Sequence, residues 1–281
     1  MLAVLTLLAI FFGQAVPDVP ASERRVLMEL YASTGGARWT NHDGWGSAQS
    51  ACDWYGVRCD FTGGDATRPV VFGLSLVSNN LDGELPSALG DLGHLKFLNV
   101  AGNKLRGKLP EGLLQRWDRQ ALELAADYNA FSNAVVRATV EYEASGTLCS
   151  PTEDLRYRLV VDGPKDRATF QSVRCADTKS RATYCLVREG SAPPLLRLSR
   201  ALGSLGFAGL RPEYDFPYTG MTHGLYLTTE AVWGGGAKTS VRTYARQGPV
   251  ESWTAQQLFL SLLVEAEWER EYRKPKCDFE K

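Results

Sequence analysis

Several common signs of catalysis, metal binding and membrane insertion are missing from this 281-residue sequence. It has no CxxC pair, and its three histidines, His42, His94 and His223, are scattered, none with a second histidine at helical spacing. We expect ordinary surface or turn histidines and therefore no metal site. The motifs GxSxG, HExxH and GxGxxG and the Walker loop are also absent. We accordingly predict no catalytic residues and no cofactor.

The charge and hydrophobicity of the chain limit the classes of partner that it can be expected to bind. The formal net charge is -1 with 44% hydrophobic residues, so a core can form and nothing favours nucleic acid or an anionic membrane surface. The apolar run from Leu2 to Phe12 is about 11 residues long, against the ~20 that a spanning helix needs. Gly13, Gln14 and Ala15 follow as a small-x-small pattern. We predict a signal peptide over residues 1–15 and no membrane span in the mature chain; a retained anchor or a buried first helix is the alternative.

The six cysteines fit this prediction of export, because an even count outside the cytosol favours disulfides. The protein would then be secreted, or periplasmic in the cell envelope. Four of the cysteines lie in the second half: Cys149, Cys175, Cys185 and Cys277. They allow three pairings, among which the sequence does not choose. A bond between Cys149 and Cys175 is one guess, and a Cys277 that staples the C-terminal tail to the sheet is the alternative.

Two consecutive stretches, beginning at Val71 and Leu95, repeat the same pattern with a period of 24 residues. The matched positions are Leu74 with Leu98, Leu76 with Val100, Asn79 with Asn103, Leu81 with Leu105, Gly83 with Gly107, Leu85 with Leu109, Pro86 with Pro110 and Leu89 with Leu113. A degraded third copy carries Leu124, Asn129 and Phe131, two residues out of register. We expect Leu74, Leu76, Leu98 and Val100 to point inward from short strands. Asn79 and Asn103 would turn the chain and bond its backbone as an asparagine ladder. Such turns stack into a solenoid whose ends need caps.

The repeat pattern LxxLxLxxNxLxGxLP resembles the plant-type extracellular leucine-rich repeat family. In that family an N-terminal cap carries the signature C-x-W-x-G-V-x-C, which is met here by Cys52, Trp54, Gly56, Val57 and Cys59. The resemblance covers roughly residues 22–131. It implies a disulfide between Cys52 and Cys59 that pins the cap loop over the first repeat, with Trp54 packed beneath it. It also implies a concave binding face, although two clear repeats make only a short one.

The second half alternates strand and helix patterns in the order β, β, β, α, β, β, α, which indicates an antiparallel sheet with two helices on one face. Hairpins should turn at residues 162–164 and 234–236, a helix should begin near Pro193, and a last helix, capped by Ser252 or Thr254, should run to Arg273. The stretches RYRLVVDG, LGFAGLRPEYDF and KTSVRTYA loosely resemble a domain of unknown function in bacterial exported proteins, which implies no activity. The predicted fold is thus a short capped α/β leucine-rich repeat solenoid followed by an α+β domain. Its parts are a signal peptide (1–15), a cap (16–69), repeats (70–131) and the α+β domain (132–281).

The function predicted from these features is recognition of a protein or peptide by an exported, non-catalytic protein. The residues expected on the concave face are Phe72, Ser75, Val77, Ser78, Lys96, Phe97, Asn99 and Ala101. Phe72 and Phe97 could instead pack against the cap or the second domain. Two other functions stay open. In one, the second domain is a hydrolase-like enzyme, with Glu141 and Glu143 on one strand face, although a solvated face explains that pair better. In the other, the repeats are a structural brace. The sequence sets no oligomeric state.

Overall fold

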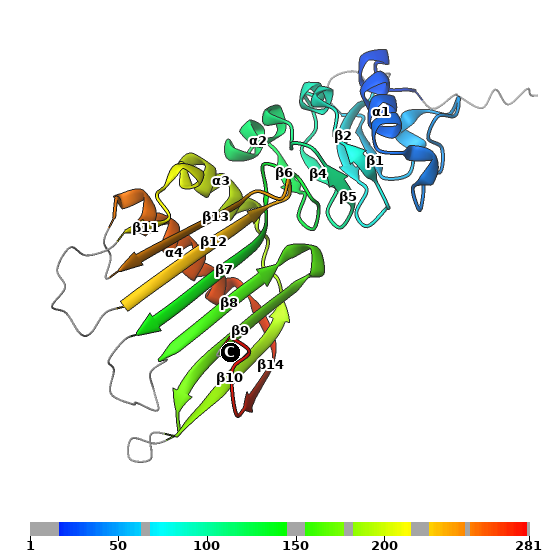
Figure 1. Cartoon of the computed structure of the whole chain (residues 1–281). Coiled ribbons are helices and arrows are strands. Elements are labelled where there is room, and N and C mark those ends of the chain that lie inside the picture. The colour runs from blue at the N-terminus through cyan, green and yellow to red at the C-terminus, as the bar shows by residue number, and fades with distance from the viewer. Residues whose placement is uncertain are drawn as a thin grey trace, which may run out of the picture.

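The computed structural model describes residues 17–62, 68–144, 155–176, 182–214, 225–244 and 248–279. The predicted signal peptide and Cys149 lie outside these residues. Within them, no helix combines the length and the apolar character needed to cross a membrane. A cap and a stack of short parallel strands make up the N-terminal part, and a large antiparallel sheet makes up the C-terminal part (Figure 1).

The cap begins with helix α1 (Ala21–Ser33), which buries Val26, Leu27 and Leu30. Its N-cap is Pro20, which makes no side-chain capping bond. Two short 3-10 helices, η1 (Gly36–Arg38) and η2 (Ala51–Asp53), and strand β1 (Val57–Asp60) complete the cap. Three tryptophans fill it. The ring centroids of Trp39 and Trp45 are 4.9 Å apart, and those of Trp45 and Trp54 are 5.0 Å apart.

The cap signature is explained by how its residues meet the first repeat. Cys52 and Cys59 form the expected disulfide, with their Cα atoms 5.5 Å apart. Trp54 packs into the same core and is 2% exposed. Gly56 has a φ of +78°, and a Cβ on it would lie 2.4 Å from the carbonyl oxygen of Ser75. Only glycine combines this backbone conformation with so close an approach, so the signature fixes the cap against strand β2 (Val70–Ser75).

The repeats contribute three parallel strands, β2, β4 (Phe97–Asn99) and β6 (Glu123–Ala125), and β1 pairs antiparallel with β2. Leu74 lies opposite Leu98, which lies opposite Leu124. The four expected inward residues are all buried: Leu74, Leu76, Leu98 and Val100. The opposite side of each coil holds η3 (Ser87–Asp91) or α2 (Glu111–Asp118), and β3 (Asp82–Glu84) pairs with β5 (Lys104–Arg106) between them.

The asparagine ladder is present and extends to the third repeat. The side-chain oxygen of Asn103 accepts hydrogen bonds from the backbone N–H groups of Asn79 (2.9 Å) and Leu81 (3.0 Å). Its amide nitrogen donates to the carbonyls of Leu76 and Val100, both at 2.8 Å. Asn129 donates to the same Val100 carbonyl at 2.9 Å, so its repeat joins the stack despite the shifted spacing. Each buried amide thus satisfies backbone groups of two successive coils.

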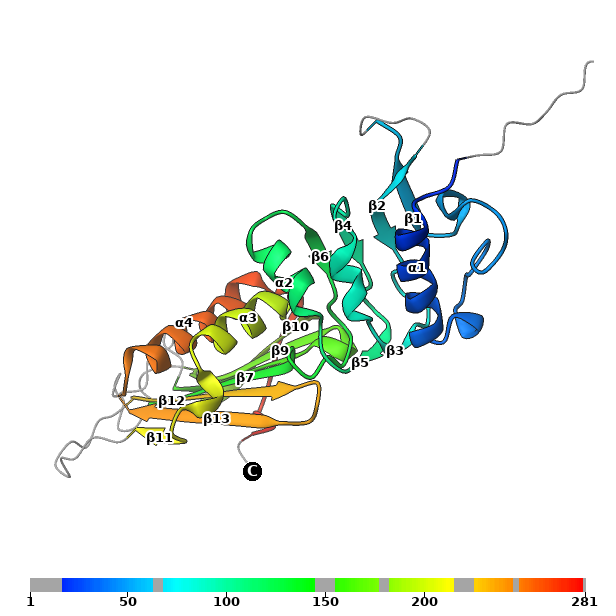
Figure 2. The same ribbon diagram turned by 90° about the horizontal axis from the view of Figure 1, so that it is seen from above.

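The α+β part is an eight-stranded sheet, counted over the described residues, in the order β11-β13-β12-β7-β8-β9-β10-β14. The strands are β7 (Val135–Ala144), β8 (Arg156–Asp162), β9 (Arg167–Cys175), β10 (Thr183–Ser191), β11 (Glu213–Tyr214), β12 (Leu225–Trp233), β13 (Lys238–Tyr244) and β14 (Glu267–Lys274). Helices α3 (Leu196–Ser204) and α4 (Val250–Glu265) lie on one face, as predicted (Figure 2). Both expected hairpins form, with short 3-10 helix η4 (Gly163–Lys165) turning the first and η5 (Phe207–Gly209) following α3.

The C-terminus departs from the prediction in two places. The last helix ends at Glu265 rather than Arg273, because residues 267–274 extend and pair with β10 at the edge of the sheet. Its N-cap is Pro249, so neither Ser252 nor Thr254 has that role. Cys277 then bonds Cys185, with Cα atoms 5.1 Å apart, and staples the tail to the sheet. The pairing of Cys149 with Cys175 stays a prediction.

The ladder predicts which asparagine the repeats depend on. Asn103→Ala should lower the free energy of unfolding by about 3 kcal/mol, because it leaves several buried backbone groups without partners. Asn99→Ala is the matched control, since Asn99 is half-buried and its side chain accepts one bond from nearby Ala101. Urea unfolding of both variants checks this. Equal losses for the two would contradict a ladder-dependent stack.

Candidate protein-binding surface

The outward face of the strands β1, β2 and β4 is the surface on which the sequence placed a ligand. Across its first row, Arg58 of β1 pairs with Gly73 of β2, and Gly73 pairs with Phe97 of β4. The next row has Ser75 opposite Asn99. Beyond the strand ends, the Ser78 amide donates to the Ala101 carbonyl at 2.9 Å. The structure therefore gathers the expected residues along one face.

Phe97 lies across the neighbouring strand. A Cβ placed on Gly73 would come within 2.1 Å of the Phe97 ring, so the absence of a side chain there makes room for the ring. The Arg58 guanidinium lies over the same ring, 5.5 Å from its centroid, a cation–π distance. Phe97 is thus half-buried against the cap, which agrees in part with the alternative that it packs there.

Phe72 stays exposed on this face, with 41% of its surface accessible. The pairing of β1 with β2 shifts register at this point, because Arg58 pairs with Gly73 and Cys59 pairs with Val71. Phe72 is the extra residue of that bulge. Its carbonyl accepts the Lys96 amide at 2.7 Å, so Lys96, also exposed, lies beside it. We call Arg58, Phe72, Lys96 and Phe97 the aromatic patch.

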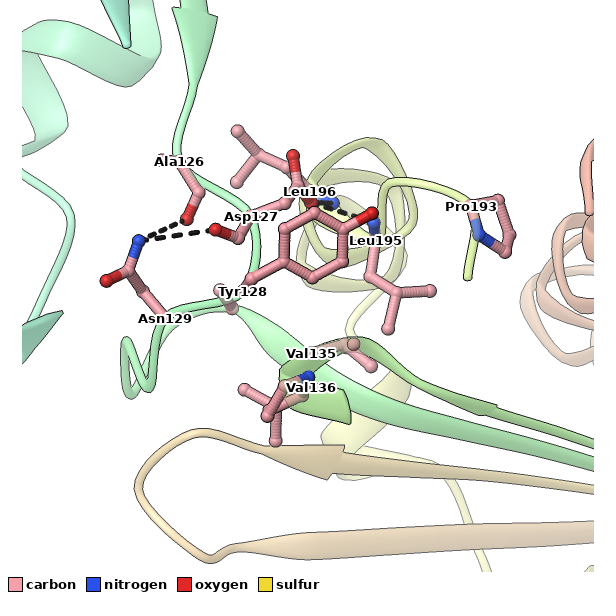
Figure 3. Close-up of a pocket in the computed structure, with 12 residues that line it drawn as sticks. Ala126, Asp127, Tyr128, Asn129, Val135, Val136, Pro193, Leu195 and Leu196 are labelled. Atoms are coloured by element: carbon pink, nitrogen blue, oxygen red, sulfur yellow. Dashed lines mark hydrogen bonds between the residues drawn. The ribbon is translucent and has the colours of Figure 1, made fainter. Parts of the chain in front are cut away.

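The outward face of the third repeat has a different role. Asp127 comes two residues before the ladder Asn129, as Val77 and Ala101 come two residues before theirs. One of its carboxylate oxygens accepts the backbone N–H groups of Leu195 (2.9 Å) and Leu196 (3.1 Å) at the start of α3. Figure 3 shows this side chain reaching α3 while Asn129 turns to the carbonyls of Ala126 and Asp127. Leu195, the N-cap residue of α3, makes no side-chain capping bond, so the third repeat supplies the cap.

Further contacts surround this cap and join the two parts of the chain. The Tyr128 hydroxyl donates to the Ala192 carbonyl at 3.1 Å. Burial, aided by nearby acidic groups, raises the pKa of Tyr128 to about 12, so this donor keeps its proton at neutral pH. The Val135 amide donates to the Ser199 hydroxyl at 2.7 Å, and Leu196 packs into the core of the repeats.

Ion pairs and a hairpin extend the junction. Arg200 of α3 pairs with Asp118 (2.5 Å) and Glu111 (3.1 Å) at the two ends of α2. The Gly234 amide, at the tip of the β12–β13 hairpin, donates to the Ala134 carbonyl at 3.0 Å. The outward face therefore stays open over the first two repeats, while at the third it meets α3. Sequence reasoning missed this role of Asp127. The one signal was that an aspartate occupies the repeat position at which the first two repeats have Val77 and Ala101.

The two carboxylates considered for catalysis, Glu141 and Glu143, face arginine residues of the adjacent strand. Glu141 forms an ion pair with Arg158 of the adjacent strand, and Glu143 lies opposite Arg156. This arrangement is a row of cross-strand pairs on the sheet face away from the helices. Over the described ranges, no three His, Cys, Asp or Glu side chains group in a way that could hold a metal ion.

The capping aspartate gives a test with two variants. Asp127→Ala removes the oxygen that accepts both hydrogen bonds and should lower the free energy of unfolding by about 1–2 kcal/mol. Asp127→Asn keeps an oxygen acceptor without a charge, so it should cost much less. Thermal or urea unfolding at neutral pH measures both. Equal destabilisation by the two would contradict the capping role.

The same variants carry a pH dependence. Burial raises the pKa of Asp127, and the bonds from Leu196 and Leu195 oppose this only in part. The folded carboxyl therefore holds its proton to higher pH than the unfolded one, whose pKa is about 3.8. Its contribution to stability falls as pH rises from there through the raised folded value. The free energy of unfolding of Asp127→Asn should therefore rise relative to that of the original chain as pH increases over this range. A difference between the two that stays constant with pH would contradict this prediction.

Comparison with known proteins identifies the first part of the chain. Residues 20–60 match the leucine rich repeat N-terminal domain. Receptor-like protein 3 of Arabidopsis thaliana is 35% identical over 75 residues, 27% of this chain and 9% of that protein. The LRR receptor-like serine/threonine-protein kinase SIK1 of Oryza sativa subsp. japonica is 36% identical over 81 residues, 29% of this chain and 8% of that protein. The match thus spans less than a tenth of these relatives' lengths.

Among solved structures, the LRR ectodomain of the receptor kinase SOBIR1 from Arabidopsis thaliana matches 41% of this chain and 58% of that chain. The identity is 24% and the TM-score is 0.32. The sequence matches, the cap signature with its disulfide and the parallel repeat strands all lie in the same part of the molecule. The N-terminal part of this chain is thus similar to plant extracellular leucine-rich repeat proteins, with a match to the leucine rich repeat N-terminal domain at residues 20–60.

Proposed function

We propose that this chain is a secreted, non-catalytic recognition protein whose aromatic patch binds a protein or peptide. The observation that carries the proposal is the make-up of the patch. Phe72 is 41% exposed on a strand face beside the two cationic side chains of Arg58 and Lys96. Aromatic and arginine side chains supply most of the binding energy at protein interfaces. Exposed aromatic residues that gather on one face are typical of an interaction site.

The chemistry of the patch favours an acidic segment with an apolar side chain. Arg58 and Lys96 provide positive charge and Phe72 provides exposed apolar area, while the exposed Glu123 of β6, opposite Phe97, bounds the patch on the side of the third repeat. Phe97 is already held by Gly73 and Arg58, so little side-chain freedom is lost when a partner covers it. The expected partner is an extended acidic peptide or an acidic loop of a protein.

We further propose that the repeats form a short solenoid capped at both ends. Residues 16–69 cover the first coil and the α+β domain (132–281) covers the third, which leaves residues 70–131 between them. The Asp127 cap, the Arg200 ion pairs and Leu196 support this division, because they fill the end that a ragged third repeat would expose. The same contacts favour the second candidate function, in which the repeats and the α+β domain brace one another. No observation favours the hydrolase alternative.

The location that suits these features is outside the cell. The disulfides at Cys52–Cys59 and Cys185–Cys277 require an oxidising compartment, and the family is extracellular. The relatives give no support to a periplasmic location. The signal peptide over residues 1–15 remains a prediction.

Affinity capture from extracellular extract tests the patch. The bait is residues 16–281 with its disulfides intact, and the variant is Phe72→Ala with Lys96→Ala. Because both side chains are exposed, the double variant should fold normally yet bind its captured partner at least tenfold more weakly. Binding should also weaken as salt rises, because the rim is charged.

The matched control is Val264→Ala, which removes an exposed apolar side chain from α4, far along the chain from the patch. It should capture the partner as well as the original bait does. A partner held equally by all three baits would contradict the proposed site. A partner lost with the control as well would show that the loss is not specific to the patch, and this too would contradict the proposed site.

A further inference from the structure

A cavity with a volume of about 560 Å³ lies between α4 and the sheet, at a distance in sequence from every residue of the aromatic patch. Four sheet residues line it, Tyr142 of β7, Tyr157 of β8, Leu227 of β12 and Thr243 of β13. Helix α4 contributes Trp253, Gln256 and Leu260. This volume falls in the range of about 300–1,000 Å³ that is typical of small-molecule sites.

The described walls of the cavity combine aromatic and aliphatic side chains with a few uncharged polar ones. The rings of Tyr142 and Tyr157 stack with their centroids 4.9 Å apart and an interplanar angle of 15°. Leu227 lies opposite Tyr142 on the neighbouring strand, so the sheet offers a continuous apolar surface. None of the described lining residues is an Asp, Glu, Lys, Arg or His, so a charged ligand would find no counter-charge among them.

One polar group in the cavity wall is buried and has spare hydrogen-bonding capacity. Gln256 is 4% exposed, and its amide nitrogen donates to the hydroxyl of Thr243, which is 1% exposed. No residue in the described part of the chain donates to the amide oxygen of Gln256. Among the described residues, only the indole nitrogen of Trp54 is fully buried without a partner, so the oxygen of Gln256 is accessible from the cavity. An accessible acceptor in a lining without charged residues offers a ligand one directional hydrogen bond.

The composition of α4 gives a second, independent indication. No charged residue occurs from Ser252 to Val264, and apolar side chains lie on every side of the helix among a few serine, threonine and glutamine residues. A helix of this kind is normally buried on every side. Only part of α4 packs on the sheet and α3, and Trp253 at the rim of the cavity is 41% exposed. A bound apolar molecule would cover this side of the helix.

From these observations we infer that the α+β domain binds an uncharged, largely apolar small molecule with one hydrogen-bonding group, which Gln256 receives. A hollow of this size suits a small molecule better than the surface of a second chain, which would need a flatter face. The site stands apart from the aromatic patch, so either can fail without the other.

Fluorescence titration with the neutral probe N-phenyl-1-naphthylamine tests this inference on residues 16–281. Saturable binding of one probe per chain is expected. Thr254→Trp and Gln257→Trp each place a large ring into the cavity from an exposed position of α4, so each should weaken binding at least fivefold. Two filling variants are used so that one remains if the other folds poorly, as judged by circular dichroism and thermal unfolding. Val264→Ala, on the same helix but not in the cavity lining, should bind the probe as the original chain does.

Competition then tests the chemistry of the ligand. At pH 8, 1-decanol should displace the probe at a concentration at least tenfold lower than decanoate, because none of the described lining residues carries a positive charge. Gln256→Leu should weaken decanol relative to the probe, which needs the amide less. Equal binding of the probe to the original chain and to a folded cavity-filling variant would overturn the inference. So would non-saturating binding, or stronger displacement by decanoate.

Discussion

The two hydrogen bonds that the Asp127 carboxylate accepts from the start of α3 determine how the two parts of this molecule are joined. A helix begins with backbone N–H groups that have no partner within the helix, and α3 follows Pro193, Pro194 and Leu195, whose side chains cannot cap it. The last repeat supplies the missing acceptor. Since Leu196 enters the core of the repeats at the same point, the cap and the packing depend on one another.

This junction also determines how much of the repeat face is open to partners. In a longer array of repeats, successive strands would continue the outward surface of β2, β4 and β6. Here the third coil turns its outward Asp127 and the adjoining Tyr128 toward the α+β domain. The open face is therefore short, and it is concentrated next to the cap, where Arg58 holds Phe97 over Gly73. A small, partly ordered patch of this kind favours a peptide or a loop over a large partner surface.

The sequence was sufficient for those features that depend on local repetition. The inward leucines, the ladder asparagines and the hairpin turns each follow from spacing or from turn chemistry, and the cap disulfide follows from a family signature. Asp127 could not be predicted in its role, because capping α3 joins residues 68 positions apart. The ring of Phe97 across Gly73 depends on strand register. Residues 267–274 follow a long apolar helix without a glycine or proline between them, and only the open edge of β10 draws them into the sheet.

The claim that the repeats and the α+β domain form one cooperative unit is tested most directly by native-state hydrogen exchange. The backbone amides of β4 (Phe97–Asn99) report on the repeats, and those of β8 (Arg156–Asp162) report on the sheet. Exchange would be followed as urea is raised below the unfolding transition. Our account predicts that the two sets converge on one opening free energy and lose protection together. Loss of protection in β4 at a lower urea concentration, with β8 still fully protected, would contradict it.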